Sequence, residues 1–372
     1  MHPLKVSLSN HHGEPVESRA GTASQRRGAA KSRPNIREIA ALAGVSISAV
    51  SLAVNGKPGV SAAKRAHVLQ IVYELGYVPN GQRAPVGTHV LGLLMETLSI
   101  PAAHDRFYAE IVAGIEDAAQ RLGYRLLLHL YRPGVDPIGD IRALMGRDIA
   151  GLIIANGGDV TDDVIERIAR GRTPLVLVEN YVSQPVPAVL ADNFTAGLEV
   201  TRYLLGLGHT RIGALPGPAK YKSLVDRLRG HTVALMEHGV TSDPDLQPGP
   251  TPGHPRKGYV QMQELLALPL RPTAVFAVSD KTAFGAMEAI KDAGLRIPND
   301  ISIVGIDDVH ESAYASPALT TYHVPKRELG ETAVLTIHGL LGASGSGKAP
   351  APAKIALAGH LVMRESCAKP PD

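Results

Sequence analysis

The chain has 372 residues, of which 44% are hydrophobic and 20% charged, and its formal net charge is +3 at pH 7. This length supports two or three domains with a large core, and the composition excludes a chain dominated by disorder or by membrane spans. No N-terminal stretch has the apolar run of a signal peptide, so we expect a cytoplasmic protein without membrane contact. The single Cys367 leaves no internal disulfide.

Positive charge is concentrated near the N-terminus. Residues 26–83 hold nine lysines and arginines against two glutamates, which leaves seven net positive charges there and a mildly acidic remainder. This asymmetry suits DNA binding, because counterions released from the phosphates drive association. A solvated basic surface is the alternative explanation.

The first organised region is helical. Residues 1–34 show no hydrophobic periodicity, so we expect a disordered basic tail. Residues 35–80 then predict three short helices with one small core, in which Gly44 ends the first helix, Ser46 caps the second and Ser61 begins the third.

The second predicted helix, in SISAVSLAVN, has an outward face suited to a DNA major groove. Ile47, Ser48, Ser51 and Leu52 share the face opposite its apolar side. They offer thymine-methyl contacts and hydroxyl groups but no bidentate guanine contact. Packing of Ile47 and Leu52 within the helical domain is the alternative.

From Val90 onward, apolar strands alternate with amphipathic helices, which predicts parallel sheets with crossover helices in one sheet or two lobes. The eight expected strands are VLGLLM, RLLLHL, GLIIAN, PLVLVEN, AVLADN, RIGALPG, AVFAVS and ISIVGIDD. Ligands in such folds collect at the carboxyl ends of strands. The polar residues there are Glu179, Asn180, Asp192, Asn193, Ser279, Asp280, Asp307 and Asp308.

Several separated motifs in one order resemble the lactose-repressor/galactose-repressor (LacI/GalR) family. They include NIREIAALAGVSISAVSLAVN, DRLRG, PTAVFAVSDKTAFGAMEAIKDAGLRIPNDISIVGIDD and SPALTTYHVP. The resemblance implies a helix-turn-helix DNA-binding domain over 35–80, a hinge over 81–89, and an effector-binding and dimerisation domain over 90–366. That domain is an α/β, two-lobed fold of the periplasmic-binding-protein type. Its expected lobes are about 90–190 plus 309–323 and about 191–308 plus 324–366.

The resemblance also implies roles for residues of the DNA-binding domain. The two positions after the turn serine select bases in the family, and here they are Ile47 and Ser48, while Leu52 stands where arginine is common. We expect phosphate contacts from four residues, with helix caps or solvated surface as the alternative: Ser46, Ser51, Asn55 and Lys64.

The hinge departs from the family pattern. GQRAPVGTH is shorter than the usual segment, has no leucine to wedge into the minor groove, and contains Pro85 and Gly87, which oppose a helix. We expect Arg83 to make a weaker backbone or minor-groove contact, and the DNA to be bent less.

The effector residues follow from the same resemblance. Arg227 matches the family arginine that grips ligand hydroxyls or a carboxylate, and Asp307 matches the ligand-binding acid. An ordinary surface arginine and a helix N-cap are the respective alternatives, and Phe107 or Tyr108 could equally pack in the core. The predicted effector set is Phe107, Tyr108, Glu179, Ser223, Arg227, Ser279, Asp280 and Asp307, with Asn156, Asn180, Tyr181 and Tyr221 as further candidates.

We therefore predict a transcriptional regulator, with repression favoured, that binds a palindromic operator as a homodimer. Its effector, a sugar, nucleoside or small acid with a sugar favoured, would occupy the cleft between the lobes. We expect no cofactor, metal or catalytic residue, because no nucleophile–base pair, zinc motif or complete phosphate loop is visible. The alternatives are a solute-binding receptor without DNA regulation and an enzyme on a doubly wound sheet.

Overall fold

The structure, a computed structural model, forms two compact units, one up to Asn80 and one from Gly81 onward. It describes residues 36–54, 59–61, 64, 67–68, 71, 90–97, 106–132, 134–155, 158–168, 173–250, 256–344 and 351–371. The expected tail, the hinge and most of the third helix of the N-terminal unit lie outside these residues.

The N-terminal unit contains the first two predicted helices, α1 (Ile36–Leu42) and α2 (Ile47–Val54). Gly44 adopts a φ of +61° in the turn between them, and Ser46 Oγ accepts a hydrogen bond from the Ala49 N–H at 3.1 Å. Both features were predicted. A small apolar core joins the helices to Val68, and its buried members are Ile39, Ala40, Ala43, Val50, Ala53 and Val68.

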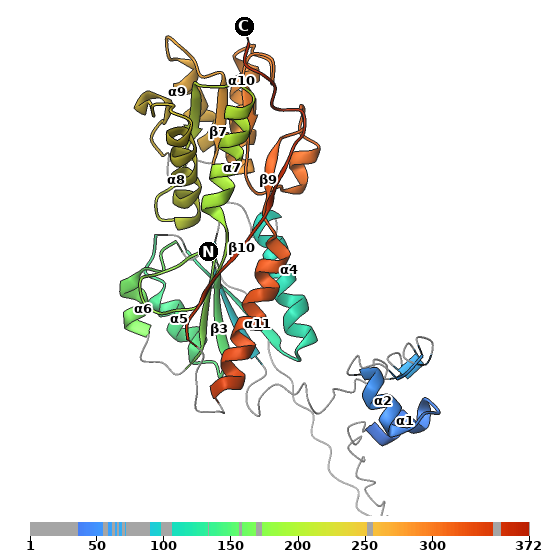
Figure 1. Cartoon of the computed structure of the whole chain (residues 1–372). Helices are drawn as coiled ribbons and strands as arrows, with labels where there is room; N and C mark the ends of the chain where they lie inside the picture. Colours follow the sequence, from blue (N-terminus) through green and yellow to red (C-terminus); the bar gives the residue numbers. More distant parts are fainter. Residues whose placement is uncertain are drawn as a thin grey trace, which may run out of the picture. The chain divides into compact units, whose positions relative to one another are not determined.

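The first lobe of the larger unit is a six-stranded parallel sheet in the order β10-β5-β4-β3-β1-β2 (Figure 1). Its strands are β1 (Val90–Glu96), β2 (Arg125–Tyr131), β3 (Gly151–Ala155), β4 (Leu175–Val178), β5 (Ala188–Ala191) and β10 (Lys354–Leu357). Two helices cover each face, and they are α4 (Arg106–Arg121) with α11 (Lys326–Ser344), and α5 (Ile138–Met145) with α6 (Asp162–Ile168). The central strands are apolar because both faces are covered.

The second lobe is built on a three-stranded parallel sheet in the order β6-β7-β8. Its strands are β6 (Ile212–Leu215), β7 (Ala274–Ala277) and β8 (Ser302–Val304). Helices α7 (Asn193–Gly206) and α8 (Lys222–Glu237) lie on one face, and α9 (Lys257–Leu266) and α10 (Asp280–Asp292) on the other. Short 3-10 helices are η2 (Pro244–Leu246) and η3 (His310–Ala313). All eight predicted strands are therefore present.

The C-terminal segments are divided between the lobes differently from the prediction. Residues 309–323 lie in the second lobe, because Ser312 in η3 donates a 2.6 Å hydrogen bond to Asp280 of α10. Helix α11 instead packs in the first lobe, against α4 and the sheet, and β10 pairs with β5. The physical reason is that α4 and α11 interlock: a Cβ on Gly114 would lie 2.1 Å from the Arg327 carbonyl oxygen.

The last strands return the chain to the second lobe. Strand β9 (Thr321–His323) pairs antiparallel with β11 (His360–Val362), which directly follows β10. The lobes are consequently joined by three connections, at 191–193, 323–326 and 357–360. Several connections of this kind allow the lobes to move relative to each other as bodies.

Two searches of the described residues gave negative results. No single helix is long and apolar enough to cross a membrane, and α1 and α2 meet that criterion only as a pair bent by 99°. Within the same residues, no three His, Cys, Asp or Glu side chains are arranged to hold a metal ion.

Candidate functional site

Helix α2 presents part of its predicted DNA face to solvent. Ile47 is 46% exposed, and Ser46 and Ser48 are exposed as well. Val50 lies in the core on the opposite side of the helix. An exposed isoleucine at the start of a helix is available for contact with a methyl group in a DNA groove.

Leu52 is less accessible than Ile47. It is half-buried, and a Cβ on Gly59 would lie 3.2 Å from Leu52 Cδ1, so this side chain lies beside the turn that follows α2. The contact supports the packing alternative for Leu52. Ser51 is half-buried and Lys64 is exposed. Asn55 and Arg83 lie outside the described residues.

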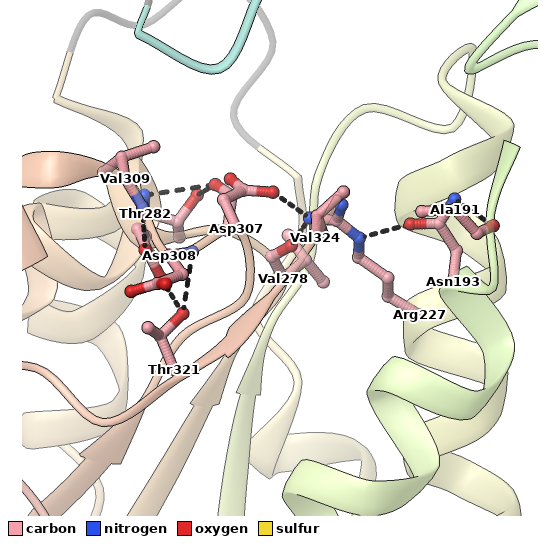
Figure 2. A network of polar contacts seen from close by, with 12 residues as sticks. Ala191, Asn193, Arg227, Val278, Thr282, Asp307, Asp308, Val309, Thr321 and Val324 are labelled. Atoms are coloured by element: carbon pink, nitrogen blue, oxygen red, sulfur yellow. Dashed lines mark hydrogen bonds and ion pairs between the residues drawn. The ribbon is translucent and has the colours of Figure 1, made fainter. Parts of the chain in front are cut away.

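The predicted effector residues Glu179, Arg227 and Asp307 lie in one polar network that crosses between the lobes. Figure 2 shows its part from Asn193 through Arg227 to Asp307. This polar network starts at Glu179, after β4 in the first lobe. It continues through Asn193 at the start of α7 to Arg227 on α8, and ends at Asp307 after β8. Polar side chains from both lobes, of the kind that bind ligands, thus meet where the carboxyl ends of the two sheets face each other.

Arg227 occupies the centre of this polar network. Only 2% exposed, it donates from Nε to Asn193 Oδ1 at 2.7 Å, and from an Nη to the Val278 carbonyl and to Asp307 Oδ1, both at 2.8 Å. Gly197 permits the close approach of α8, because a Cβ there would lie 1.9 Å from the Arg227 carbonyl oxygen. The alternative of a solvated surface arginine is therefore wrong.

Glu179 joins the first lobe to this arginine. Its carboxylate accepts hydrogen bonds from the Ala191 N–H at 2.6 Å and from Asn193 Nδ2 at 3.2 Å. Burial raises the pKa of Glu179, and the charge of Arg227 acts in the opposite direction. The residue has a φ of +55°, a left-handed backbone that glutamate rarely adopts.

The turn at Asp307 and Asp308 is strained and is held by Lys326. The two residues have φ values of +136° and +52°, conformations that cost about 1–3 kcal/mol each. Lys326, 1% exposed, donates from Nζ to the Asp307 carbonyl at 2.7 Å and to the Asp308 carbonyl at 3.2 Å. Because η3 is preceded by Val309, Asp307 does not cap it, and the N-cap alternative is wrong.

Ser279 and Asp280 have structural partners. Ser279 caps α10 by accepting from the Thr282 N–H, and Asp280 accepts hydrogen bonds from Ser312 Oγ at 2.6 Å and Thr321 Oγ1 at 2.5 Å. Burial, and next the charge of Asp307, raise the pKa of Asp280 to about 7. With no exposed surface, Asp280 ties η3 and β9 to α10.

The aromatic pair lies at the beginning of α4. Phe107 is buried in the main core and its ring meets that of Tyr108 edge to face, with centroids 5.0 Å apart. This position supports core packing for Phe107. Tyr108 is half-buried, as is Ser223 in the first turn of α8.

A second set of contacts joins the lobes beside this polar network. Lys220, in the loop after β6, donates to Glu96 Oε1 at 2.7 Å and to Asp159 Oδ2 at 3.1 Å, and Tyr221 donates to Glu96 at 2.9 Å. We call these four residues the interlobe latch. Glu96 Oε2 is buried and has no hydrogen-bond partner among the described residues, so it can accept one more donor.

The further candidates have separate positions. Tyr181 donates to Asp226 at 2.9 Å, which links the lobes, whereas Asn180 donates to the Val160 carbonyl within the first lobe. Asn156 lies outside the described residues.

Sequence reasoning missed Lys220, Lys326 and the latch acids. Lys326 follows Pro325 at the start of a helix, a position where the sequence predicts a lysine exposed to solvent. It is buried because it lies where the two lobes meet. Asn193 carried a signal, its place at a strand end, but nothing in the sequence indicated that it joins Glu179 to Arg227.

Comparisons with known proteins match both units. Residues 35–80 fit the family described as bacterial regulatory proteins, lacI family, and residues 201–367 fit the periplasmic binding protein-like domain. The ribose operon repressor of Haemophilus influenzae is 34% identical over 315 residues, which cover 81% of this chain and 90% of that protein.

Solved structures match over most of the chain as well. The complex of the transcriptional regulator CelR with cellobiose is 29% identical, with a TM-score of 0.68, over 90% of this chain and 100% of that one. The lac repressor dimer bound to operator and the anti-inducer ONPF is 27% identical, with a TM-score of 0.66, over 90% and 99%.

Proposed function

The chain belongs to the LacI family of bacterial regulatory proteins, and from this we propose that it is a transcriptional repressor that binds a palindromic operator as a homodimer. Its effector is a small molecule bound between the two lobes. The observation that carries the proposal is the buried ion pair of Arg227 and Asp307. Arg227 is on α8 and Asp307 follows β8, and the two meet at the lobe boundary.

The proposed effector is sugar-like, with nucleosides and small acids as the other classes. Sugar hydroxyls both donate and accept, so they can replace the Arg227–Asp307 contact and satisfy each partner. The unpartnered Glu96 Oε2 supplies a further acceptor within the described residues. The named relative regulates a ribose operon and a matched structure holds cellobiose, which supports this class.

Regulation requires that effector and operator favour different arrangements of the lobes, since a ligand with equal affinity for both would shift nothing. The interlobe latch and the polar network are the contacts that such a rearrangement would remake. Effector binding is thereby coupled to the DNA-binding domain through the first lobe and the hinge.

DNA recognition is proposed for α2 and its surroundings. Ile47 and Ser48 contact bases, Leu52 contributes apolar surface, and Ser46, Ser51, Asn55 and Lys64 contact phosphates. The exposure of Ile47, Ser48 and Lys64 supports this assignment. With its shortened segment, the hinge places Arg83 against the DNA backbone or minor groove without a leucine wedge.

The protein is proposed to act in the cytoplasm without cofactor, metal or catalytic residue. A solute-binding receptor is the second candidate, because the two-lobed body alone would serve it. The match over residues 35–80 favours the regulator, since a receptor has no use for a DNA-binding domain.

Selection of bound fragments from a random DNA library, followed by footprinting, tests the function. We expect a palindromic site with two protected half-sites, altered in sequence by Leu52→Arg and bent only weakly in a gel-shift assay. Non-specific binding of every fragment would refute a regulator, and a strong central kink would refute the hinge proposal.

A further inference from the structure

Two lysines lie at adjoining helix N-termini, and one of them, Lys281, follows by three residues Val278, whose carbonyl accepts a hydrogen bond from Arg227. Lys257 is the first residue of α9 and Lys281 is the second residue of α10. The two helices touch at these ends, because a Cβ on Gly258 would lie 2.0 Å from the Thr282 carbonyl oxygen. The first turns of α9 and α10, which carry the two lysines, are therefore in contact.

Lys257 is a half-buried cation in a positive environment. Burial, and next the charge of Lys281, lower the pKa of Lys257 to about 8; Arg227 also lowers it, and Asp307 acts in the opposite direction. Among the residues that the structure describes, Lys257 forms no hydrogen bond or ion pair. An ammonium group partly removed from water without a partner is costly and favours an anionic ligand.

The acidic side chains around Arg227 and the interlobe latch already accept hydrogen bonds from groups other than Lys257. Their donors are Arg227 for Asp307, Ser312 and Thr321 for Asp280, Asn193 for Glu179, and Lys220 for both Glu96 and Asp159. None of these carboxylates forms a hydrogen bond or ion pair with Lys257, although Glu96 Oε2 has no partner among the described residues. Within the described part of the chain, Lys257 therefore lacks a paired acid.

We propose that the effector carries an anionic group, a phosphate or a carboxylate, that binds Lys257 together with Lys281, while Arg227 and Asp307 bind its hydroxyl groups. This inference rests on the proposed function and narrows its ligand class. Charge-assisted hydrogen bonds are the strong ones in proteins, and a half-buried lysine strengthens them because less water competes.

Calorimetric titration of the full chain with matched neutral and anionic sugars tests the proposal. The probes are ribose with ribose 5-phosphate, and glucose with glucose 6-phosphate and gluconate. We expect at least one anionic member to bind about 10-fold or more tightly than its neutral counterpart, since a hydrogen bond to a charged group contributes that much. The phosphate and carboxylate arms identify the anionic group.

Substitutions at Lys257 localise the effect. Lys257→Met is expected to weaken the anionic probe about 10- to 100-fold, whereas Lys257→Arg retains most of the affinity. The matched control is Lys291→Met, an exposed lysine at the other end of α10, which should leave the affinity unchanged.

Three results would overturn the inference: tighter binding of the neutral member, full affinity in Lys257→Met, or no binding by any anionic probe. Operator binding, measured on the same preparations, distinguishes a wrong ligand class from a wrong proposed function. If it persists while the anionic probes fail, only the ligand class is wrong; if it is absent, the proposed function is wrong.

Discussion

At the scale of single residues, the site is built from costly features that support one another. Glu179, Asp307 and Asp308 have left-handed backbones, and Arg227 is a charge almost without solvent contact. Each is tolerable because its neighbours hold it: Lys326 binds the carbonyls of the turn, and Asn193 and Asp307 bind the guanidinium. Strain retained in this way is typical of functional sites.

Removing the central arginine should be strongly destabilising. Arg227→Met leaves Asp307 buried without its cation, so we expect the free energy of unfolding to fall by about 3–5 kcal/mol. Urea unfolding followed by circular dichroism measures it. The control Arg202→Met removes an exposed ion pair with Glu237 and should cost less than about 1 kcal/mol. Equal losses in both variants would show that Arg227 is not held as described.

Asp280 predicts a pH dependence with a definite sign. Its folded pKa of about 7 exceeds the ordinary value of 3.8, so the folded state binds more protons between those values. Stability from this group is therefore lost as pH rises from 4 to 7, by at most about 1.4 kcal/mol per unit.

Comparison with Asp280→Asn isolates the effect, because other titrating groups contribute equally to both proteins. In urea titrations at pH 5, 6, 7 and 8, the wild type should lose stability relative to the variant up to pH 7 and then level off. A constant difference across this range would contradict the raised pKa.

At the scale of elements, three helix pairs interlock through glycines. Gly197 meets α8, Gly114 meets α11 and Gly258 meets α10, each with a would-be Cβ about 2 Å from a backbone oxygen of the partner helix, at 1.9, 2.1 and 2.0 Å. A backbone carbonyl cannot move aside as a side chain can. These contacts therefore fix where Arg227 and Lys257 stand.

Gly197→Ala should separate α7 from α8. We expect a loss of about 1–3 kcal/mol in the free energy of unfolding, because the added methyl meets packed backbone. Gly206→Ala, in the same helix with no atom within 4 Å of its Cβ, should be neutral or stabilising by up to about 1 kcal/mol. Thermal melts of the pair provide the comparison, and an unaffected Gly197→Ala would contradict the close contact.

The elements differ in how far the sequence could predict them. The eight strands were predictable because strands such as β1 and β3 are apolar on both faces. Strand β10 alternates exposed and half-buried residues at a sheet edge, and β9 and β11 have three residues each, too few for a periodic signal. The lobe in which α11 packs depends on which helix and sheet its apolar face contacts. Hydrophobic periodicity predicts that the helix has such a face but not its partner.

The site was predictable in part for the same reason. Arg227, Asp307 and Glu179 were identified through the family motifs, and the structure places all three in one polar network. The structural roles of Ser279 and Asp280 depend on η3 and β9, whose position comes from tertiary packing. Lys326 became important only because two lobes bury it.

At the scale of the whole molecule, the proposed dimer needs an exposed apolar surface. Strand β2 is an edge of the first sheet, and its Leu128 and Leu130 are 47% and 43% exposed. Two leucines at a sheet edge are a ready surface for a second copy of the chain. Dimerisation there would bring two DNA-binding domains to one operator.

Charged residues at these positions should separate the dimer. The double variant Leu128→Lys/Leu130→Lys is expected to sediment as a monomer at concentrations where the wild type is dimeric, and to lose operator affinity. Met236→Lys, at an exposed apolar position on α8, is the control and should leave the sedimentation coefficient unchanged. A dimeric double variant would place the interface elsewhere.

In the proposed mechanism, a ligand bound between the lobes changes operator affinity through Arg227. Fluorescence anisotropy with the selected operator, with and without the ligand that binds the wild type, measures it directly. We expect the wild-type Kd for operator to change about 5- to 150-fold on ligand addition. Arg227→Lys, which loses the guanidinium fork, should bind the operator with a Kd that the ligand does not change. An operator affinity that the bound ligand leaves unchanged in the wild type would contradict the account.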